Sequence, residues 1–197
     1  MFMTSLETLS ATSARERLLS AAAVLFYRDG IAATGIDAIV KRAGVAKKSL
    51  YNNFDSKAAL VAAYLEARHA EWLTLFEVRL SQAATPAARV LAVFLAYQDH
   101  AEGAYERGFR GCGLLNAAAE LPAGHKGREA VRRHKQQVEA LLAAPLLEMT
   151  GDEAAASCLA RQLAFLLEGA MVRAGLEGDS RCVQQAHDMA AALLEAI

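Results

Sequence analysis

The chain has 197 residues, of which 54% are hydrophobic and only three are proline, and its formal net charge is -1. This composition excludes a disordered chain, because it supplies enough apolar surface to bury a core. Alanine, leucine, glutamate and arginine are abundant and no strand pattern is evident, so the sequence favours an all-α fold.

The charge is divided unevenly along the chain. Residues 1–60 hold eight Lys or Arg against five Asp or Glu, a net charge of +3, and residues 61–197 hold thirteen against seventeen, a net charge of -4. A basic patch attracts a polyanion, while an acidic remainder keeps the other faces away from it. This asymmetry favours a protein that touches phosphates at one end only.

The spacing of the cysteines and the length of the hydrophobic runs indicate in which cellular compartment the protein is expected. Cys112, Cys158 and Cys182 lie far apart without a CxxC spacing, so they indicate neither a zinc site nor a disulfide framework. The first residues, MFMTSLETLS, lack the basic and apolar segments of an export signal, and no run of about 18 apolar residues predicts a membrane span. We expect a cytoplasmic protein with no membrane partner and no cofactor.

The first predicted helix follows Ser13, which can cap it, and ends at Gly30. The second opens at Thr34, whose hydroxyl can accept a backbone N–H of the first turn. It ends at Gly44, where glycine adopts the left-handed conformation at least cost. A short third helix covers residues 46–54, with Leu50 and Phe54 among its inward side chains.

A long helix follows from about Lys57 to Gln82, and Ser56 starts it. Lys57 lies in its first turn, where a cation is unfavourable unless an anion lies nearby. Further helices are predicted for residues 87–106, 112–121, 127–149 with a kink at Pro145, 152–175 and 180–195.

Residues 34–57 therefore form two short helices joined by a turn at Gly44. The second helix carries a cluster of polar side chains: Lys47, Lys48, Ser49, Tyr51, Asn52 and Asn53. Amide and ammonium groups on a short exposed helix can meet base edges and phosphates in the major groove of DNA. The alternative is a solvated helix face, but the turn and the caps in register favour contact with double-stranded DNA.

Residues 15–65 resemble the amino-terminal domain of the TetR family of bacterial transcription regulators. The shared features are the apolar helix ending in glycine, Thr34, the Ala43-Gly44-Val45 turn, the Leu50-Tyr51 pair with Phe54, and Ser56-Lys57. Members of this family are all-helical homodimers in which a three-helix head binds an operator and a variable helical body binds a small molecule that releases the DNA.

The resemblance implies a helix-turn-helix DNA-binding domain in residues 1–56 and a helical effector-binding and dimerisation domain in residues 57–197. It implies phosphate contacts for Thr34, Tyr51 and Lys57, and it assigns base or backbone contacts to a second group, Lys47, Lys48, Ser49 and Asn52. Asn53 stands where the family often has histidine, so a hydrogen-bond donor for phosphate remains there but the titratable group does not.

The resemblance extends more loosely into the body. Residues 108–125 resemble a segment of one TetR subgroup, and residues 162–175 resemble the penultimate helix, which pairs with its symmetry mate. The apolar 152–197 region also holds more leucine and methionine than one small bundle must bury, which predicts a four-helix interface in a homodimer.

Seven side chains of the body are candidates for an effector pocket, five of them aromatic: Trp72, Phe94, Tyr97, Phe109, Phe165, Asn116 and Glu168. Aromatic residues at helical spacing also fill cores, so packing is the alternative for each. The effector itself is not identified by the sequence.

Cys112 follows Arg110 and opens a predicted helix, a setting that can stabilise a thiolate, so redox sensing is one hypothesis and simple packing the other. Cys158 and Cys182 are predicted to lie in the core. Glu66 and His69 form the ExxH pair used by helical di-iron proteins, which makes a metal-dependent oxidase or ferritin-like enzyme the alternative function. That site needs a second such pair, which the sequence lacks, so we predict no catalytic and no metal site.

Overall fold

The computed structural model describes residues 13–197. Residues 1–12, including the segment that is expected to lack an export signal, lie outside the described residues. Within residues 13–197 the chain forms nine α-helices and no strand, which confirms the predicted all-α fold. The helices are α1 (Ala14–Asp29), α2 (Ile36–Ala43), α3 (Lys47–Asn53), α4 (Lys57–Leu80), α5 (Pro86–Ala101), α6 (Gly113–Ala119), α7 (Lys126–Thr150), α8 (Glu153–Glu177) and α9 (Arg181–Leu194).

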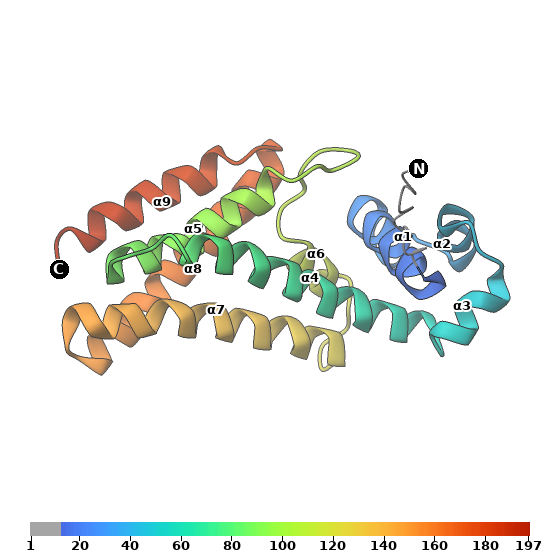
Figure 1. Ribbon diagram of the computed structural model, residues 1–197, viewed down its shortest axis with the longest axis horizontal. Helices are drawn as coiled ribbons and strands as arrows, with labels where there is room; N and C mark the ends of the chain where they lie inside the picture. Colours follow the sequence, from blue (N-terminus) through green and yellow to red (C-terminus); the bar gives the residue numbers. More distant parts are fainter. Residues whose placement is uncertain (1–12) are drawn as a thin grey trace, which may run out of the picture.

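The molecule has two parts joined by one long helix (Figure 1). We call α1 to α3 the head and α4 to α9 the body. In the body, α7 packs against α8, and α5 packs against α4, α7 and α9. Because α4 also packs against α1, the proposed domain boundary after residue 56 stays a prediction.

The start and end of α1 follow the predicted capping. The Ser13 hydroxyl accepts the backbone N–H of Glu16, and the Glu16 carboxylate accepts the backbone N–H of Ser13 in return. Gly30 ends the helix with φ 92°. At the end of α2, Gly44 has φ 62° and the N–H of Val45 reaches the carbonyl of Val40, which gives the turn that positions α3.

The predicted cap of α2 by Thr34 is wrong. The N-cap residue is Gly35, and no side chain caps this end. Thr34 is instead 3% exposed, and its hydroxyl donates to the carbonyl of Gly30 at 2.6 Å. The sequence pattern does not show whether Thr34 or Gly35 is the N-cap of α2. In the structure Thr34 is buried and its hydroxyl bonds to Gly30 at the end of α1.

Helix α5 ends five residues before its predicted end. Glu102 is the C-cap and Gly103, a poor helix former, follows it; the connection of residues 102–112 then includes Gly108 and Gly111, both with φ 84°. Pro145 lies inside α7 without ending it.

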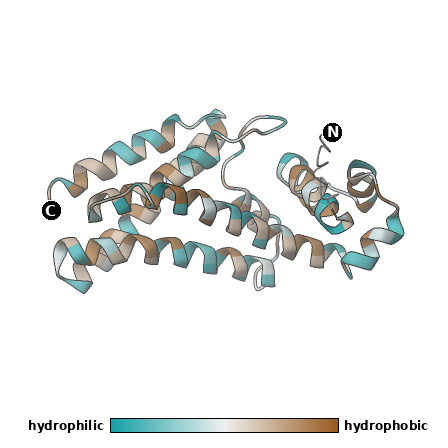
Figure 2. Ribbon diagram, in the orientation of Figure 1, coloured by the Kyte–Doolittle hydropathy of each residue, from teal (hydrophilic) through white to brown (hydrophobic). Residues whose placement is uncertain are grey.

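Helix α8 is long and apolar enough, by length and composition alone, to cross a membrane, a test that the core helix of a soluble protein also passes. In this fold it packs against α7 and α9. The long helices carry alternating apolar and polar stripes, whereas α3 is mainly hydrophilic (Figure 2).

The 102–112 connection crosses α8 at a glycine pair. A Cβ atom on Gly175 would lie 2.6 Å from the backbone nitrogen of Gly111, closer than real Cβ atoms approach backbone. The absence of a side chain at Gly175 therefore sets how closely the connection can lie on α8.

We expect Gly175→Ala to lower the free energy of unfolding by about 1–2 kcal/mol. The forced backbone shift costs about 1–3 kcal/mol and the better helix propensity of alanine returns up to about 1 kcal/mol. Urea denaturation measures this change. Arg173→Ala on the exposed side of the same helix is the control and should change stability by at most about 0.5 kcal/mol. A Gly175→Ala protein as stable as the unaltered chain would refute the close approach.

Candidate DNA-binding surface and body interior

Helix α3 presents a polar face to solvent because its apolar residues anchor the other face. Leu50 is fully buried and Phe54 is 4% exposed in the core of the head. The side chains of Lys47, Lys48, Tyr51 and Asn52 are exposed, and those of Ser49 and Asn53 are half-buried. The structure thus places the six predicted DNA-contacting side chains of this helix on or beside one accessible surface.

Two polar side chains of α3 have partners within the head. The amide of Asn53 donates to the carbonyl of Ser49 at 2.7 Å, which closes the last turn of the helix. The Lys47 ammonium lies 2.9 Å from the Asp37 carboxylate of α2. Both members of this ion pair are largely exposed, so water and salt screen it and a phosphate could take the place of Asp37.

Thr34 lies in the turn after α1, and Lys57 is the first residue of α4, so neither is on α3. The Lys57 ammonium donates to the carbonyl of Ile31 at 2.6 Å, so a backbone carbonyl supplies the negative partner that its helix position requires. The Thr34 hydroxyl is buried and bonded to Gly30. The phosphate contacts implied for these two side chains stay predictions, and Thr34 would have to break its bond to make one.

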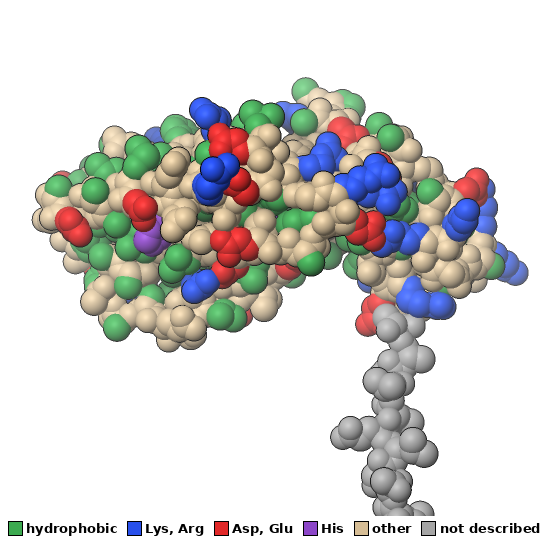
Figure 3. All heavy atoms as spheres, turned by 90° about the horizontal axis from the view of Figure 1, so that it is seen from above, with side chains coloured by type: hydrophobic (Ala, Val, Ile, Leu, Met, Phe, Trp, Pro, Cys, Tyr) green, Lys and Arg blue, Asp and Glu red, His purple; other side chains and the backbone are tan. Residues whose placement is uncertain are grey.

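Lysine and arginine side chains gather over the head and over its junction with the body (Figure 3). On the same view the body shows mixed charges. This distribution agrees with the charge asymmetry of the sequence, in which the first 60 residues are basic.

Two side chains of the body bind backbone groups at the carboxyl-terminal end of α1 and in the turn after it, and the sequence analysis did not predict these contacts. The Glu120 carboxylate accepts the N–H groups of Ile31 at 3.0 Å and Ala32 at 2.7 Å. The Arg110 guanidinium donates to the carbonyls of Tyr27 at 2.8 Å and Arg28 at 2.7 Å. These partners are 82 to 89 residues apart in sequence, so no local pattern marks them.

The predicted effector residues do not form one pocket. Trp72 and Tyr97 line a cavity of about 10 Å³, which has room for about one water molecule. Phe94 and Phe109 are buried in the core, and Phe165 is 65% exposed on α8.

The two polar candidates have local partners. Asn116 donates to the carbonyl of Arg110 at 2.9 Å, and Glu168 lies 3.7 Å from Lys135. Helical spacing identified most of the buried aromatics, but it cannot tell which neighbour each one meets.

The interior of the body holds a polar chain that the sequence analysis missed. The Nδ1 atoms of His69 and His134 lie 2.8 Å apart, so one donates and the other accepts. The Nε2 atom of His134 lies 3.3 Å from the Tyr97 hydroxyl, and Lys135 donates to that hydroxyl. Burial, with a smaller contribution from Lys135, lowers the pKa of His134 to about 3 and keeps the ring neutral.

His69 therefore pairs with a histidine of α7 rather than completing a di-iron pair with Glu66. Within residues 13–197 no group of three His, Cys, Asp or Glu side chains is placed to hold a metal ion. Nearby, the indole N–H of Trp72 is buried without a hydrogen-bond partner.

The cysteines differ from the prediction in one case. Cys112 is 6% exposed at the start of α6 and lines the 10 Å³ cavity. Cys182 is half-buried, but Cys158 is exposed on α8, so its predicted place in the core is wrong. Position 158 faces outward because the neighbouring α8 residues Ala156 and Ala160 take the inward positions.

Comparison with known proteins gives the family. The sequence profile of bacterial regulatory proteins of the TetR family matches residues 18–64. None of the curated proteins compared matches the chain. Among solved structures, a TetR-family transcriptional regulator from Streptomyces coelicolor is 30% identical with a TM-score of 0.82, and the match covers 92% of this chain and 93% of that one.

Two further solved structures are similar. A TetR transcriptional regulator from Streptomyces avermitilis is 32% identical with a TM-score of 0.68, covering 91% of this chain and 98% of that one. The reduced form of NemR from Escherichia coli is 25% identical with a TM-score of 0.71, covering 90% and 95%. The extent of the first match shows the family, one of DNA-binding regulators rather than enzymes: this chain belongs to the TetR family of bacterial transcriptional regulators.

Proposed function

We propose that this regulator is a cytoplasmic repressor that binds a near-palindromic operator as a homodimer and is released by a small-molecule effector. The observation that carries the proposal is the accessible polar face of α3, held outward by the buried side chains of Leu50 and Phe54. Family membership supports DNA binding, and the operator, the repression and the effector are proposed.

In this proposal α3 of each subunit enters a major groove. Lys47, Lys48, Ser49 and Asn52 make the base or backbone contacts, while Tyr51 and Asn53 meet phosphates. Lys47 exchanges Asp37 for a phosphate at little cost, because its present ion pair is exposed.

Dimerisation is proposed through α8 and α9. Both helices carry large apolar side chains in solvent: Phe165 at 65% exposure, Val172 at 55%, Leu176 at 80%, Met189 at 56% and Leu193 at 47%. Phe165, Val172 and Leu176 follow a spacing of seven and four residues, so they share one face of α8. A second copy would cover this face and would place the two α3 helices about 34 to 36 Å apart, or a multiple of that, on one side of the DNA.

Release requires that the effector bind the free state better than the DNA-bound state. We propose that it moves α4, which joins the head to the body, and so changes the separation of the α3 helices. Thiol modification of Cys112 is the second proposed trigger. Its burial makes that route slower than effector binding, since an oxidant must reach the sulfur.

Lys48→Ala should weaken operator binding and reduce its dependence on salt. If Lys48 neutralises one phosphate, the slope of log K against log salt concentration falls by about 0.9. Fluorescence anisotropy with operator DNA at several salt concentrations measures the slope. Arg133→Ala, which also removes an exposed positive charge but on α7, outside the proposed interface of α8 and α9, should leave the slope unchanged. A Lys48→Ala protein with the original slope would reject this phosphate contact.

Leu176→Glu should dissociate the dimer, because it places an unpaired charge in an apolar interface on each subunit. Light scattering after gel filtration should then give a mass near the 21.0 kDa of one chain at micromolar concentration. Val78→Glu, at an apolar residue 53% exposed on α4, is the matched control and should remain dimeric. Monomeric unaltered protein, or a dimeric Leu176→Glu protein, would disprove the proposed interface.

A further inference from the structure

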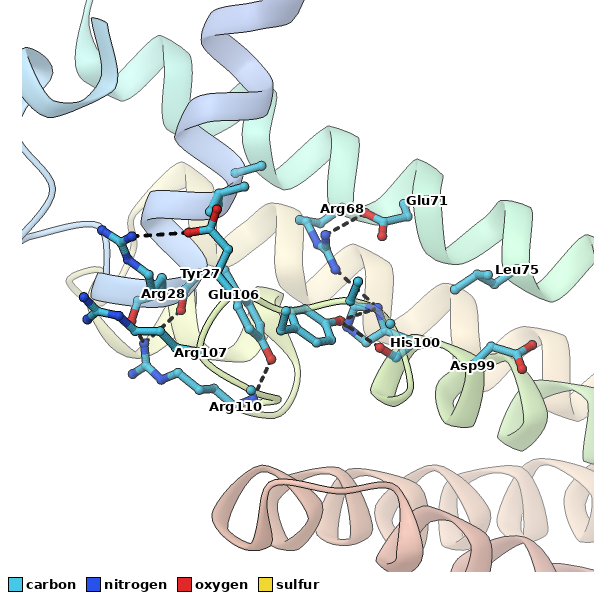
Figure 4. A pocket seen from close by; sticks show the side chains of 16 residues that line it. Tyr27, Arg28, Arg68, Glu71, Leu75, Asp99, His100, Glu106, Arg107 and Arg110 are labelled. Carbon is cyan, nitrogen blue, oxygen red and sulfur yellow. Dashed lines mark hydrogen bonds and ion pairs between the residues drawn. The ribbon is translucent and has the colours of Figure 1, made fainter. Parts of the chain in front are cut away.

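A cavity of about 240 Å³ lies between the head and the body (Figure 4). Ala23, Val24 and Tyr27 of α1 form one wall. The other walls come from the body: Arg68, Glu71 and Leu75 of α4, Asp99 and His100 of α5, and the connection from Gly103 to Arg110. Any occupant of this cavity therefore touches both parts of the molecule at once.

The lining of the cavity includes a half-buried cation, Arg68. The Arg68 side chain is 13% exposed, and its guanidinium lies 2.7 Å from the Glu71 carboxylate and 3.2 Å from Nδ1 of His100 (Figure 4). A guanidinium can only donate, so Nδ1 of His100 accepts and the ring is neutral. Burial, with a contribution from Arg68, lowers the pKa of His100 to about 3. The charge of Arg68 is thus balanced only by Glu71, whose side chain is 50% exposed.

The other charged groups of the lining leave an excess of positive charge. The Glu106 carboxylate already pairs with both Arg28 and Arg42, and Asp99 pairs with Arg79. Asp29, just outside the lining, pairs with Arg28 and Arg107. Together with Arg68, Arg110 and Glu71, these groups are six arginines and four carboxylates. Arg110 is bonded to two backbone carbonyls rather than to a carboxylate. Each acidic group of the lining therefore has an arginine partner, and an added anion would find donors that are not fully neutralised.

The apolar part of the lining comes from both sides of the cavity. The rings of Tyr27 and Tyr105 are stacked, with centroids 4.5 Å apart and planes 26° from parallel. Ala23, Val24 and Leu75 extend this surface. The volume is below the range of about 300–1,000 Å³ that is usual for drug-sized ligands, so the space suits one ring with a small substituent.

We propose that this cavity binds a small aromatic carboxylic acid, with its carboxylate on Arg68 and its ring against the apolar wall formed with Tyr27 and Tyr105. The inference rests on the proposed function, because it names the chemical class of the effector and where it binds. Since the ligand contacts α1 and the body together, its affinity depends on the angle between them, which is the condition for linking ligand binding to operator release.

The unaltered protein tests the chemical class directly. Trp72 is the single tryptophan of the chain and lines the 10 Å³ cavity. Arg68 and His100 line both this cavity and the 240 Å³ cavity, so the fluorescence of Trp72 should report a ligand bound in the larger one. Benzoate, 4-hydroxybenzoate and phenylacetate are titrated by calorimetry and fluorescence, together with their uncharged amides. We expect at least one acid to bind at one site per protomer, at least tenfold more tightly than its amide. Equal affinity of acid and amide, or no saturable binding of the three acids by millimolar concentrations, would overturn the proposal.

Variants locate the site. Arg68→Gln should weaken binding of the acid at least tenfold, and Arg68→Lys, which keeps the charge but not the planar donors, should weaken it less. Arg161→Gln, which removes an arginine on the far part of the body, should bind as the unaltered protein does. Circular dichroism checks that each variant is folded. Unchanged binding by folded Arg68→Gln protein would place the ligand elsewhere.

Operator binding without ligand, measured in parallel, separates the two proposals. A protein that binds no DNA at low salt refutes the proposed function whatever the ligand does. A protein that binds its operator but none of the acids refutes only the present inference. Loss of operator affinity when the acid is added supports both.

Discussion

The placement of the head against the body depends on the hydrogen bonds between the Glu120 carboxylate and the turn after α1. Glu120 follows α6 directly and accepts the two backbone N–H groups of Ile31 and Ala32. Ile31 is buried, whereas Ala32 and Glu120 are exposed, so water weakens the hydrogen bond to Ala32 more than the one to Ile31. Gly30 makes room for this contact, because a Cβ atom there would lie 2.9 Å from a Glu120 oxygen. The same glycine that ends α1 therefore also allows the body to grip it.

A second contact completes the grip from the other side of the helix end. Arg110 covers the carbonyls of Tyr27 and Arg28, and the Tyr27 hydroxyl accepts the Arg110 N–H at 2.6 Å and donates to the Gly111 carbonyl. Between Arg110 and Glu120 lies α6, whose first turn borders the interior cavity at Cys112, Gly113 and Leu114.

The sequence predicted what local chemistry determines. The helix cap at Ser13, the left-handed turn at Gly44 and the start of α4 after Ser56 follow from residue types at fixed offsets, and the structure confirms them. These features bring Lys48 and its neighbours onto one exposed face of α3, where the DNA contacts stay a prediction.

Contacts between side chains that are far apart in the sequence could not be predicted from local patterns. His69 and His134 are 65 residues apart and Glu120 is 89 residues from Ile31, so nothing in either neighbourhood indicates the contact. Phe165 is aromatic, as pocket residues often are, but it lies on the outer face of α8 and is exposed to solvent. Threonine is a common N-cap residue, but the side chain of Thr34 is buried instead of capping α2.

The grip of Glu120 on the head can be tested most directly by hydrogen exchange. In Glu120→Ala protein the amide of buried Ile31 should exchange about tenfold faster, since it loses a charged acceptor worth about 1.4 kcal/mol, and the amide of exposed Ala32 should exchange faster by a smaller factor, while α7 and α8 keep their protection. Glu77→Ala, at an exposed glutamate of α4, serves as the control and should leave both regions unchanged. Equal protection of Ile31 and Ala32 with and without the Glu120 carboxylate would contradict the account.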